Sequence, residues 1–247
     1  MAKGDQFLAG RRALITGAAV RLGRACALAL AEAGADVVIH YHRSRREAQA
    51  TAADIRRLGR KAWTLRADLG DPKQAARLVG QARRIARGPL DILISGASVF
   101  PKSRLEDVTA ADLAAQMQLH AMAPLELSRR FAAQTSSGDI INFLDCRIGS
   151  QAPGFVAYLI SKQALASLTA AMALKFAPGI RVNAVAPGLI LPPPGEPESY
   201  LERLKDTCPL KRHGSPQDIT EAVLFLLRGT FVTGRVIYVD GGRHLRG

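Results

Sequence analysis

Residues 13–23 read ALITGAAVRLG, an apolar run that ends in a glycine-containing turn and leads into an alanine-rich stretch at residues 22–33. The apolar run predicts a buried strand, and the alanine-rich stretch predicts a helix. Gly17 permits a tight turn, and Gly23 lets the start of the helix approach a ligand closely. Because the first N–H groups of a helix are unpaired and carry partial positive charge, this turn predicts a phosphate-binding site.

A second strand, expected at residues 36–41, completes a β-α-β unit, although the turn is not a Gly-x-Gly-x-x-Gly fingerprint. Residues 40–46 read HYHRSRR, and no acid follows before Glu47. An acid at this point would bind the ribose hydroxyls of NAD, whereas guanidinium and hydroxyl donors match a ribose 2′-phosphate. We therefore predict NADPH as the cofactor. The alternative is that these arginines only solvate the start of a helix.

Strands and helices alternate almost to the end of the chain, which is typical of a parallel sheet covered on both faces. We predict one α/β domain over residues 1–247: a Rossmann-type, doubly wound parallel sheet of seven strands with helices on both faces. The strands are expected at 12–16, 36–41, 61–66, 90–95, 138–144, 180–185 and 235–239. The helices are expected at 22–33, 45–59, 72–87, 110–134, 156–177 and 216–228.

The proline-rich segment 187–215 interrupts this alternation, with a small helix expected at 198–206. A loop of this length is usually a ligand cover or a disordered segment, and we expect it to cover the substrate.

Composition agrees with a globular enzyme, at 48% hydrophobic and 22% charged residues in a chain of 247. Residues 1–12 lack the apolar core of a signal peptide, and no apolar run approaches the length that crosses a bilayer, so we expect a cytoplasmic protein. The three cysteines are widely separated and in no metal-ligand spacing, which predicts reduced thiols and no metal site.

The net charge of +13 raises the possibility of nucleic-acid binding. The arginines are spread over separate predicted helices, and no nucleic-acid-binding motif accompanies them. We therefore expect solvated helix faces and no dedicated nucleic-acid site.

Tyr158 and Lys162 are four residues apart on a predicted helix and follow Asp145, which comes at the end of an apolar run. Residues at this spacing share one helix face, so the ammonium group of Lys162 is expected to favour ionisation of the Tyr158 phenol. The pair then forms a general acid. The spacing by itself also arises by chance on any helix.

These motifs together resemble the short-chain dehydrogenase/reductase family. The resemblance rests on TGxxxRxG at residues 16–23, Tyr158-x-x-x-Lys162, RVNAVAPG at residues 181–188 and VDGG at residues 239–242, and it spans nearly the whole chain. It implies the strand order 3-2-1-4-5-6-7, hydride transfer from a nicotinamide to a substrate near Tyr158, and a homotetramer.

Within that family the chain is similar to the pteridine reductase branch, which includes bacterial dihydromonapterin reductases. Most members have serine where this chain has Asp145, and pteridine reductases have aspartate there. Arg21, residues 40–44 and the C-terminal segments 231–235 and 240–246 also resemble this branch. His120 replaces the asparagine of the family's catalytic tetrad, and its role stays open between a satisfied core histidine and a functional residue.

Reduction of a pterin would explain why an aspartate, Asp145, replaces the serine of most family members. Reducing a C=N bond requires a proton on a ring nitrogen, which a second carboxyl group helps to deliver. We expect hydride to reach C6 of a 7,8-dihydropterin and N5 to be protonated through Asp145 and Tyr158. The resemblance implies that Lys162 binds the nicotinamide ribose and lowers the pKa of Tyr158. The alternative for Asp145 is a hydrogen-bonded strand terminus.

Residues 95–100, SGASVF, occupy the family's Asn-Asn-Ala-Gly position but lack its amides. The resemblance implies that Ser98 contacts the pterin, that Phe100 stacks on it, and that Asp68 meets the adenine ring. Phe100 as core filling and Asp68 as a helix cap are the alternatives. The expected cofactor-binding residues are Gly17, Arg21, Leu22, Gly23, His42, Arg43, Ser44, Asp68, Leu69, Ser95, Gly96, Ala97, Lys162, Pro187 and Gly188. The expected substrate-binding residues are Arg21, Ser98, Phe100, Asp145, Tyr158, Gly188 and Leu189.

Two other functions remain open. A 3-oxoacyl-carrier-protein reductase or general carbonyl reductase would share the cofactor site but would normally have serine at position 145. A non-catalytic NADPH-binding regulator would be expected to have lost Tyr158 or Lys162, and both residues are present.

Overall fold

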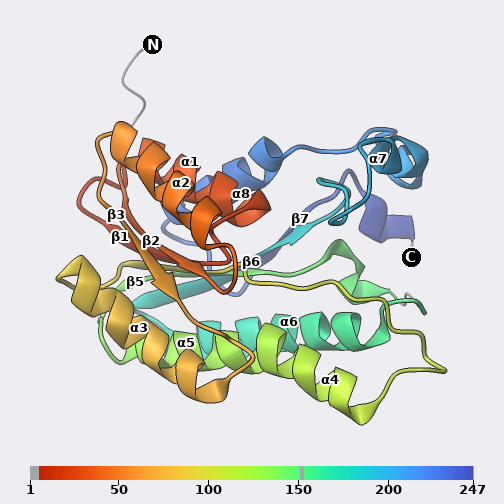
Figure 1. Ribbon diagram of the computed structural model, residues 1–247, viewed down its shortest axis with the longest axis horizontal. Helices are drawn as coiled ribbons and strands as arrows, with labels where there is room; N and C mark the ends of the chain where they lie inside the picture. Colours follow the sequence, from red (N-terminus) through yellow and green to blue (C-terminus); the bar gives the residue numbers. More distant parts are fainter. Residues whose placement is uncertain (1–5, 151–152, 247) are drawn as a thin grey trace.

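The computed structural model describes residues 6–150 and 153–246 as a parallel sheet with helices on both faces (Figure 1). The sheet has seven strands in the order β3-β2-β1-β4-β5-β6-β7, which confirms the expected fold and strand order. The strands are β1 (Arg12–Thr16), β2 (Asp36–Tyr41), β3 (Ala62–Arg66), β4 (Ile92–Ser95), β5 (Gly138–Phe143), β6 (Ile180–Pro187) and β7 (Val236–Val239). The main helices are α1 (Arg21–Glu32), α2 (Arg45–Arg57), α3 (Pro72–Ala86), α4 (Ala110–Met117), α5 (Ala123–Ala132), α6 (Val156–Phe176) and α8 (Pro216–Arg228).

Strand β1 shows how the apolar sequence builds two cores. Ala13, Leu14 and Ile15 are fully buried. Successive residues of a strand point to opposite faces, so Ile15 joins the core under α1, α2 and α8, and Leu14 joins the core under α3 and α5. Central strands of a parallel sheet are covered on both sides, which explains the unbroken apolar run.

The helix expected at residues 110–134 is interrupted. A π-helical turn, η1 (Gln118–Met122), separates α4 from α5, and His120 within it is buried. Pro124 lies in the first turn of α5 and has no backbone N–H, so it cannot continue a regular hydrogen-bond ladder from α4. Turns of this kind often lie at functional sites.

The segment after β6 is only partly irregular. It contains α7 (Ser199–Leu204) and the 3-10 turn η3 (Lys205–Thr207), close to the small helix expected there. β6 also continues two residues beyond its expected end, to Pro187. The backbone N–H of Gly214 donates to the carbonyl oxygen of Leu189 at 2.9 Å, which closes the segment at its base.

Within the described residues, helix α6 is long and apolar enough by length and composition to cross a bilayer. Lys162 and Lys175 interrupt its apolar residues, so the helix is not an unbroken apolar run. Half of that stretch is buried inside the fold, where α6 packs against β6 and α4. The length of α6 reflects its place in the core.

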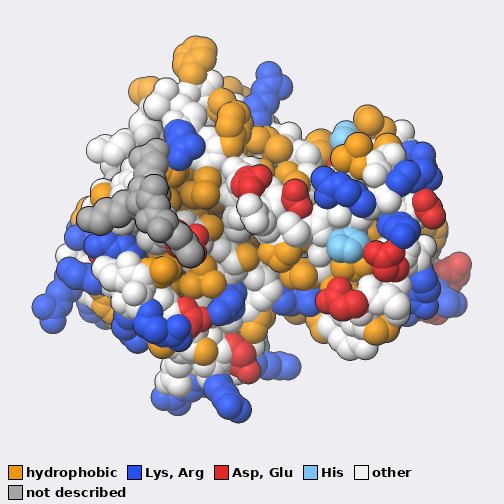
Figure 2. All heavy atoms as spheres, turned by 90° about the horizontal axis from the view of Figure 1, so that it is seen from above, with side chains coloured by type: hydrophobic (Ala, Val, Ile, Leu, Met, Phe, Trp, Pro, Cys, Tyr) orange, Lys and Arg blue, Asp and Glu red, His pale blue; other side chains and the backbone are white. Residues whose placement is uncertain are grey.

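The basic side chains are not gathered into one patch on the face drawn in Figure 2. Figure 2 shows the face covered by α1, α2 and α8, where Lys and Arg side chains occupy several separate places. The three cysteines are free and buried, and the described residues contain no cluster of acidic, histidine or cysteine side chains that could hold a metal ion.

Candidate active site

The candidate site lies where the carboxyl ends of β1, β4, β5 and β6 meet. β1 pairs with β2 on one side and with β4 on the other, so the chain reverses its winding direction at β1. Ligands of doubly wound sheets bind at such a switch point. The turn after β1 and the segment after β4 touch here, because a Cβ on Gly17 would lie 2.9 Å from Cα of Ala97.

The glycine turn has the shape that a phosphate requires. Gly17 has a φ of +69°, and a Cβ added to Gly23 would lie only 2.2 Å from the carbonyl oxygen of Gly17. Helix α1 begins at Arg21, and Val20 at its N-cap has no side-chain hydrogen bond to the first turn. The first N–H groups of α1 thus receive no side-chain cap, as an anion-binding helix terminus needs.

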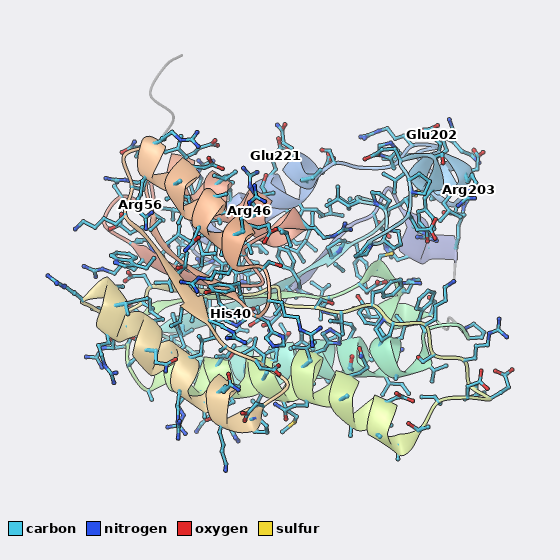
Figure 3. The ribbon with its side chains drawn as sticks, in the orientation of Figure 1. His40, Arg46, Arg56, Glu202, Arg203 and Glu221 are labelled. Carbon is cyan, nitrogen blue, oxygen red and sulfur yellow. The ribbon has the colours of Figure 1, made fainter. Side chains whose placement is uncertain are left out.

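His40 supports this turn from strand β2, where it is drawn in Figure 3. The N–H of Gly17 donates to Nδ1 of His40 at 3.2 Å, and Nε2 lies 3.1 Å from the carbonyl oxygen of Ala67. Nδ1 is therefore the acceptor and Nε2 carries the proton. Burial lowers the pKa of His40 to about 4, so the ring is neutral at physiological pH.

The end of β2 keeps the donors that were predicted for a 2′-phosphate. Arg43 is exposed, and Ser44 is the N-cap of α2 with no capping hydrogen bond from its side chain. Nε2 of His42 lies 3.6 Å from Oδ2 of Asp68. Asp68 does not cap the next helix; Asp71 does.

Thr16 connects the segment after β4 to β1. This segment has Ser95 and Gly96 where the family's Asn-Asn-Ala-Gly motif has two asparagines. Oγ1 of Thr16 accepts hydrogen bonds from the N–H groups of Gly96 at 3.0 Å and Ala97 at 3.1 Å. Ser95 is buried in β4, and its Oγ has no hydrogen-bond partner.

Asp145 and Tyr158 are in direct contact. The Tyr158 hydroxyl donates to Oδ2 of Asp145 at 3.2 Å, and Tyr158 is buried. Lys162, one turn later on α6, donates from Nζ to the carbonyl oxygen of Phe143 at 2.7 Å. The three residues that the sequence selects as catalytic therefore lie around one point, at the carboxyl end of β5.

Arg147 joins this group and was not predicted. It lies in the 3-10 turn η2 (Cys146–Gly149), for which Asp145 is the N-cap. Its Nε donates to Oδ1 of Asp145 and its Nη2 to Oδ2, both at 2.9 Å. Burial favours the neutral form of the Asp145 carboxyl group, but the hydrogen bonds and charge of Arg147 outweigh it and hold the pKa of Asp145 below its ordinary value.

The pKa of Tyr158 differs from the expectation. Burial, and then the negative charge of Asp145, raise the pKa of Tyr158 well above its ordinary value, with Arg147 opposing in part. Lys162 was expected to lower this pKa, but its Nζ donates to Phe143 and lies 5.7 Å from the centroid of the Tyr158 ring. Burial itself lowers the pKa of Lys162 to about 8. The phenol therefore keeps its proton and can act as a donor.

His120 is held in one tautomer. The N–H of Val99 donates to Nε2 of His120 at 3.3 Å, so Nδ1 carries the proton and faces Oγ of Ser161 at 3.0 Å. The hydroxyl of Ser98 lies 3.1 Å from the same Nε2. Burial and the charge of Lys162 lower the pKa of His120 to about 2. A neutral histidine thus fixes the segment after β4 against α6.

Phe100 stacks on a residue that the sequence did not single out. Its ring lies 4.1 Å from that of Phe155, with 11° between the planes, and meets Tyr158 edge-on at 4.7 Å. The pterin-stacking role remains a prediction, and a flat substrate must use the other face of Phe100 or displace Phe155.

The remaining predicted site residues differ in their burial and in their hydrogen-bond partners. The side chain of Leu69 is buried in one core, so only its backbone is available to a cofactor, and the side chain of Leu22 is partly buried against the other core. Gly188 donates from its N–H to the carbonyl oxygen of Val239, and Leu189 is buried in a small cluster with Leu201 and Cys208, within segment 187–215. Nη2 of Arg21 donates to the carbonyl oxygen of Pro192 at 2.6 Å, which links the glycine turn to that segment.

We expect acid to destabilise the protein through its two buried neutral histidines, His40 and His120. Their pKa values are lowered to about 4 and about 2, whereas an unfolded histidine binds a proton below about pH 6.5. The unfolded chain therefore binds more protons, and stability falls as the pH drops from 6.5 towards 4, by about 1.4 kcal/mol per pH unit for each histidine. Urea unfolding at pH 7.5, 6.0 and 5.0 measures this slope. In H120N the histidine contribution to the slope of unfolding free energy against pH should fall to about half. A slope in H120N equal to that of the unaltered protein would contradict a buried neutral His120.

Comparison with known proteins agrees with this geometry. The family model described as enoyl-(acyl carrier protein) reductase matches residues 17–244. An uncharacterised oxidoreductase of Mycobacterium tuberculosis is 38% identical over 96% of this chain and 94% of its own length. Pteridine reductase 1 of Leishmania tarentolae is 32% identical over 94% of this chain and 96% of its own length. The crystal structure of FolM alternative dihydrofolate reductase 1 from Brucella canis complexed with NADP has a TM-score of 0.89 and 33% identity, and the match covers 96% of each chain. The chain is an oxidoreductase that belongs to the short-chain dehydrogenase/reductase family.

Proposed function

We propose that this protein is an NADPH-dependent pteridine reductase that converts dihydropterins to tetrahydropterins. The observation that carries the proposal is the hydrogen bond from Tyr158 to Asp145, at 3.2 Å. A serine hydroxyl is enough to orient a ketone oxygen, whereas a carboxylate beside the phenol suits protonation of a ring nitrogen. The similarity to pteridine reductase 1 and to FolM supports the same substrate class.

The residues at the glycine turn and at the end of β2 fit NADPH. The tight approach of Gly17 and Gly23 and the uncapped start of α1 suit the pyrophosphate. Arg43 and Ser44 suit the 2′-phosphate, and Lys162 would hold the nicotinamide ribose. When bound, NADPH supplies the hydride, which we assign to C6 of the dihydropterin.

The protein supplies the proton. Tyr158 keeps its proton because burial and Asp145 raise its pKa. Its hydroxyl is therefore the immediate donor to N5, and Asp145 holds the phenol in place by accepting its hydrogen bond. Ser98 and Phe100 border the same space and would contact the pterin ring.

The decisive experiment is an NADPH oxidation assay with dihydromonapterin, dihydrobiopterin, dihydrofolate and an acetoacetyl thioester. We expect turnover with at least one of the pterins or dihydrofolate, and kcat/KM for the thioester at least about 10²-fold lower, because the carboxylate at position 145 replaces the hydroxyl suited to a ketone. Rapid thioester reduction without pterin turnover would instead identify a carbonyl or 3-oxoacyl reductase. NADPH binding without any turnover would identify a regulator.

We also propose a cytoplasmic homotetramer, by similarity to the family. Light scattering of the purified protein measures the subunit number, and a monomer would contradict it.

A further inference from the structure

Arg147 is a charged residue beside Asp145 that the proposed function does not use. Its side chain is 21% exposed, and that of Asp145 is 14% exposed. Three hydrogen bonds from Arg147 reach Asp145: the backbone N–H and Nε both donate to Oδ1, and Nη2 donates to Oδ2, each at 2.9 Å. A two-point guanidinium–carboxylate contact fixes orientation as well as charge.

The guanidinium group is also held by the aromatic pair. Its central carbon lies 5.2 Å from the centroid of Phe100 and 5.3 Å from that of Phe155. A cation at this distance is attracted to the ring faces, and the attraction strengthens away from water. Arg147 is thus held between the carboxylate and the aromatic side chains that border the site.

The other charged groups do not replace it. Lys162 acts on Asp145 through its charge, while its Nζ is hydrogen-bonded to the carbonyl oxygen of Phe143. The thiol of Cys146 is protonated, because burial raises its pKa to about 12, and Arg243 and Asp240 face that thiol. His120, which faces Tyr158 from η1, is neutral.

We infer that Arg147 is the positioning residue of this site: its guanidinium group holds Asp145 as an anion against the Tyr158 hydroxyl and supplies the positive charge that balances the pair. When Tyr158 gives its proton to the substrate nitrogen, negative charge remains on the phenol oxygen beside Asp145. Arg147 offsets that charge at close range. The role deepens the proposed function and rests on it for the substrate, whereas the hold on Asp145 can be measured separately.

The kinetic test compares R147M and R147K with the unaltered enzyme, using the pterin that gives the highest turnover. We expect R147M to lower kcat about 10- to 100-fold and to move the acidic limb of the kcat–pH profile to higher pH, because Asp145 then protonates more easily. R147K keeps the charge but loses the two-point contact, so it should recover part of the loss. The dissociation constant for NADPH should change less than about twofold.

A second measurement needs no substrate. Carbon-13 NMR of aspartate-labelled protein follows the titration of the Asp145 carboxyl group, and D145N identifies its signal. R147M should shift this titration to higher pH. R130M is the matched control, because Arg130 pairs with Glu126 on the surface of α5, at 2.8 Å and one helical turn away. It should change neither readout.

The two measurements separate the inference from the proposed function. If no pterin is reduced but R147M still shifts the titration of Asp145, the function is wrong and the hold of Arg147 on Asp145 stands. An Asp145 titration and a pH profile that both remain unchanged in R147M would overturn the role of Arg147, whichever substrate is turned over.

Discussion

Replacing Asp145 with asparagine should reduce kcat for dihydropterin reduction by about 10²- to 10⁴-fold, the range expected when a proton-transfer residue is removed. The asparagine amide lacks the negative charge that balances Arg147. Its NH₂ group is a donor and would face the donors of Arg147 and Tyr158, from which the carboxylate now accepts hydrogen bonds. NADPH should still bind, because the glycine turn follows β1 whereas Asp145 follows β5. Steady-state kinetics and a fluorescence titration with NADPH measure the two effects separately.

D206N is the matched control for this substitution. Asp206 carries an exposed carboxylate that pairs with Lys211, 3.4 Å away. The control should keep kcat within about twofold. Turnover by D145N at the unaltered rate would refute the proton-transfer role, and a loss of NADPH binding in D145N would show that the carboxylate acts on the cofactor site.

Replacing Gly23 with alanine should lower both the stability of the protein and its affinity for NADPH. The new Cβ would lie 2.2 Å from the carbonyl oxygen of Gly17 and 3.0 Å from Cα of Ala18, and both of these are backbone atoms. Overpacking of this kind costs about 1–3 kcal/mol, which lowers the melting temperature by roughly 2–10 °C. Because the turn must open, the dissociation constant for NADPH should rise by at least about tenfold.

The matched control is G80A on α3. Gly80 is also helical, but a Cβ there meets nothing within 4 Å. Alanine at an open helix position stabilises by about 0.5–1 kcal/mol, so the melting temperature should stay the same or rise slightly. Differential scanning calorimetry with and without NADPH compares the two variants. Equal NADPH affinity in G23A and the unaltered protein would contradict the assignment of the phosphate turn.

Much of the fold could be predicted because the strands are marked by local runs of apolar residues. Ala13, Leu14 and Ile15 are apolar without interruption because β1 is covered on both faces. Element ends were less predictable. The π turn at residues 118–122 depends on where His120 finds partners, namely Val99 from the segment after β4 and Ser161 on α6. Pro124 is a local signal that the helix is interrupted, but the partners of His120 come from outside residues 110–134.

The candidate site was predicted where a motif carried it and missed where only packing did. Tyr158 and Asp145 were singled out through their spacing, their residue types and the family resemblance, and the structure places them in contact. Arg147 is two residues from Asp145 and looks in sequence like any other arginine of a basic protein; its adjacency to the aspartate was the only signal. Thr16 was read as part of a family motif, but its bonds to Gly96 and Ala97 required the pairing of β1 with β4.

The sequence by itself determined the parallel sheet, the glycine turn, the basic and hydroxyl side chains at the end of β2 and the two residues proposed as the catalytic pair, because these depend on local composition and spacing. Only the tertiary structure decided how the charges act on one another. Lys162 donates to the carbonyl oxygen of Phe143, whereas Arg147 donates to Asp145 of the Asp145–Tyr158 pair. Electrostatic effects depend on burial and on distances between elements, and the chain acquires both only when it folds.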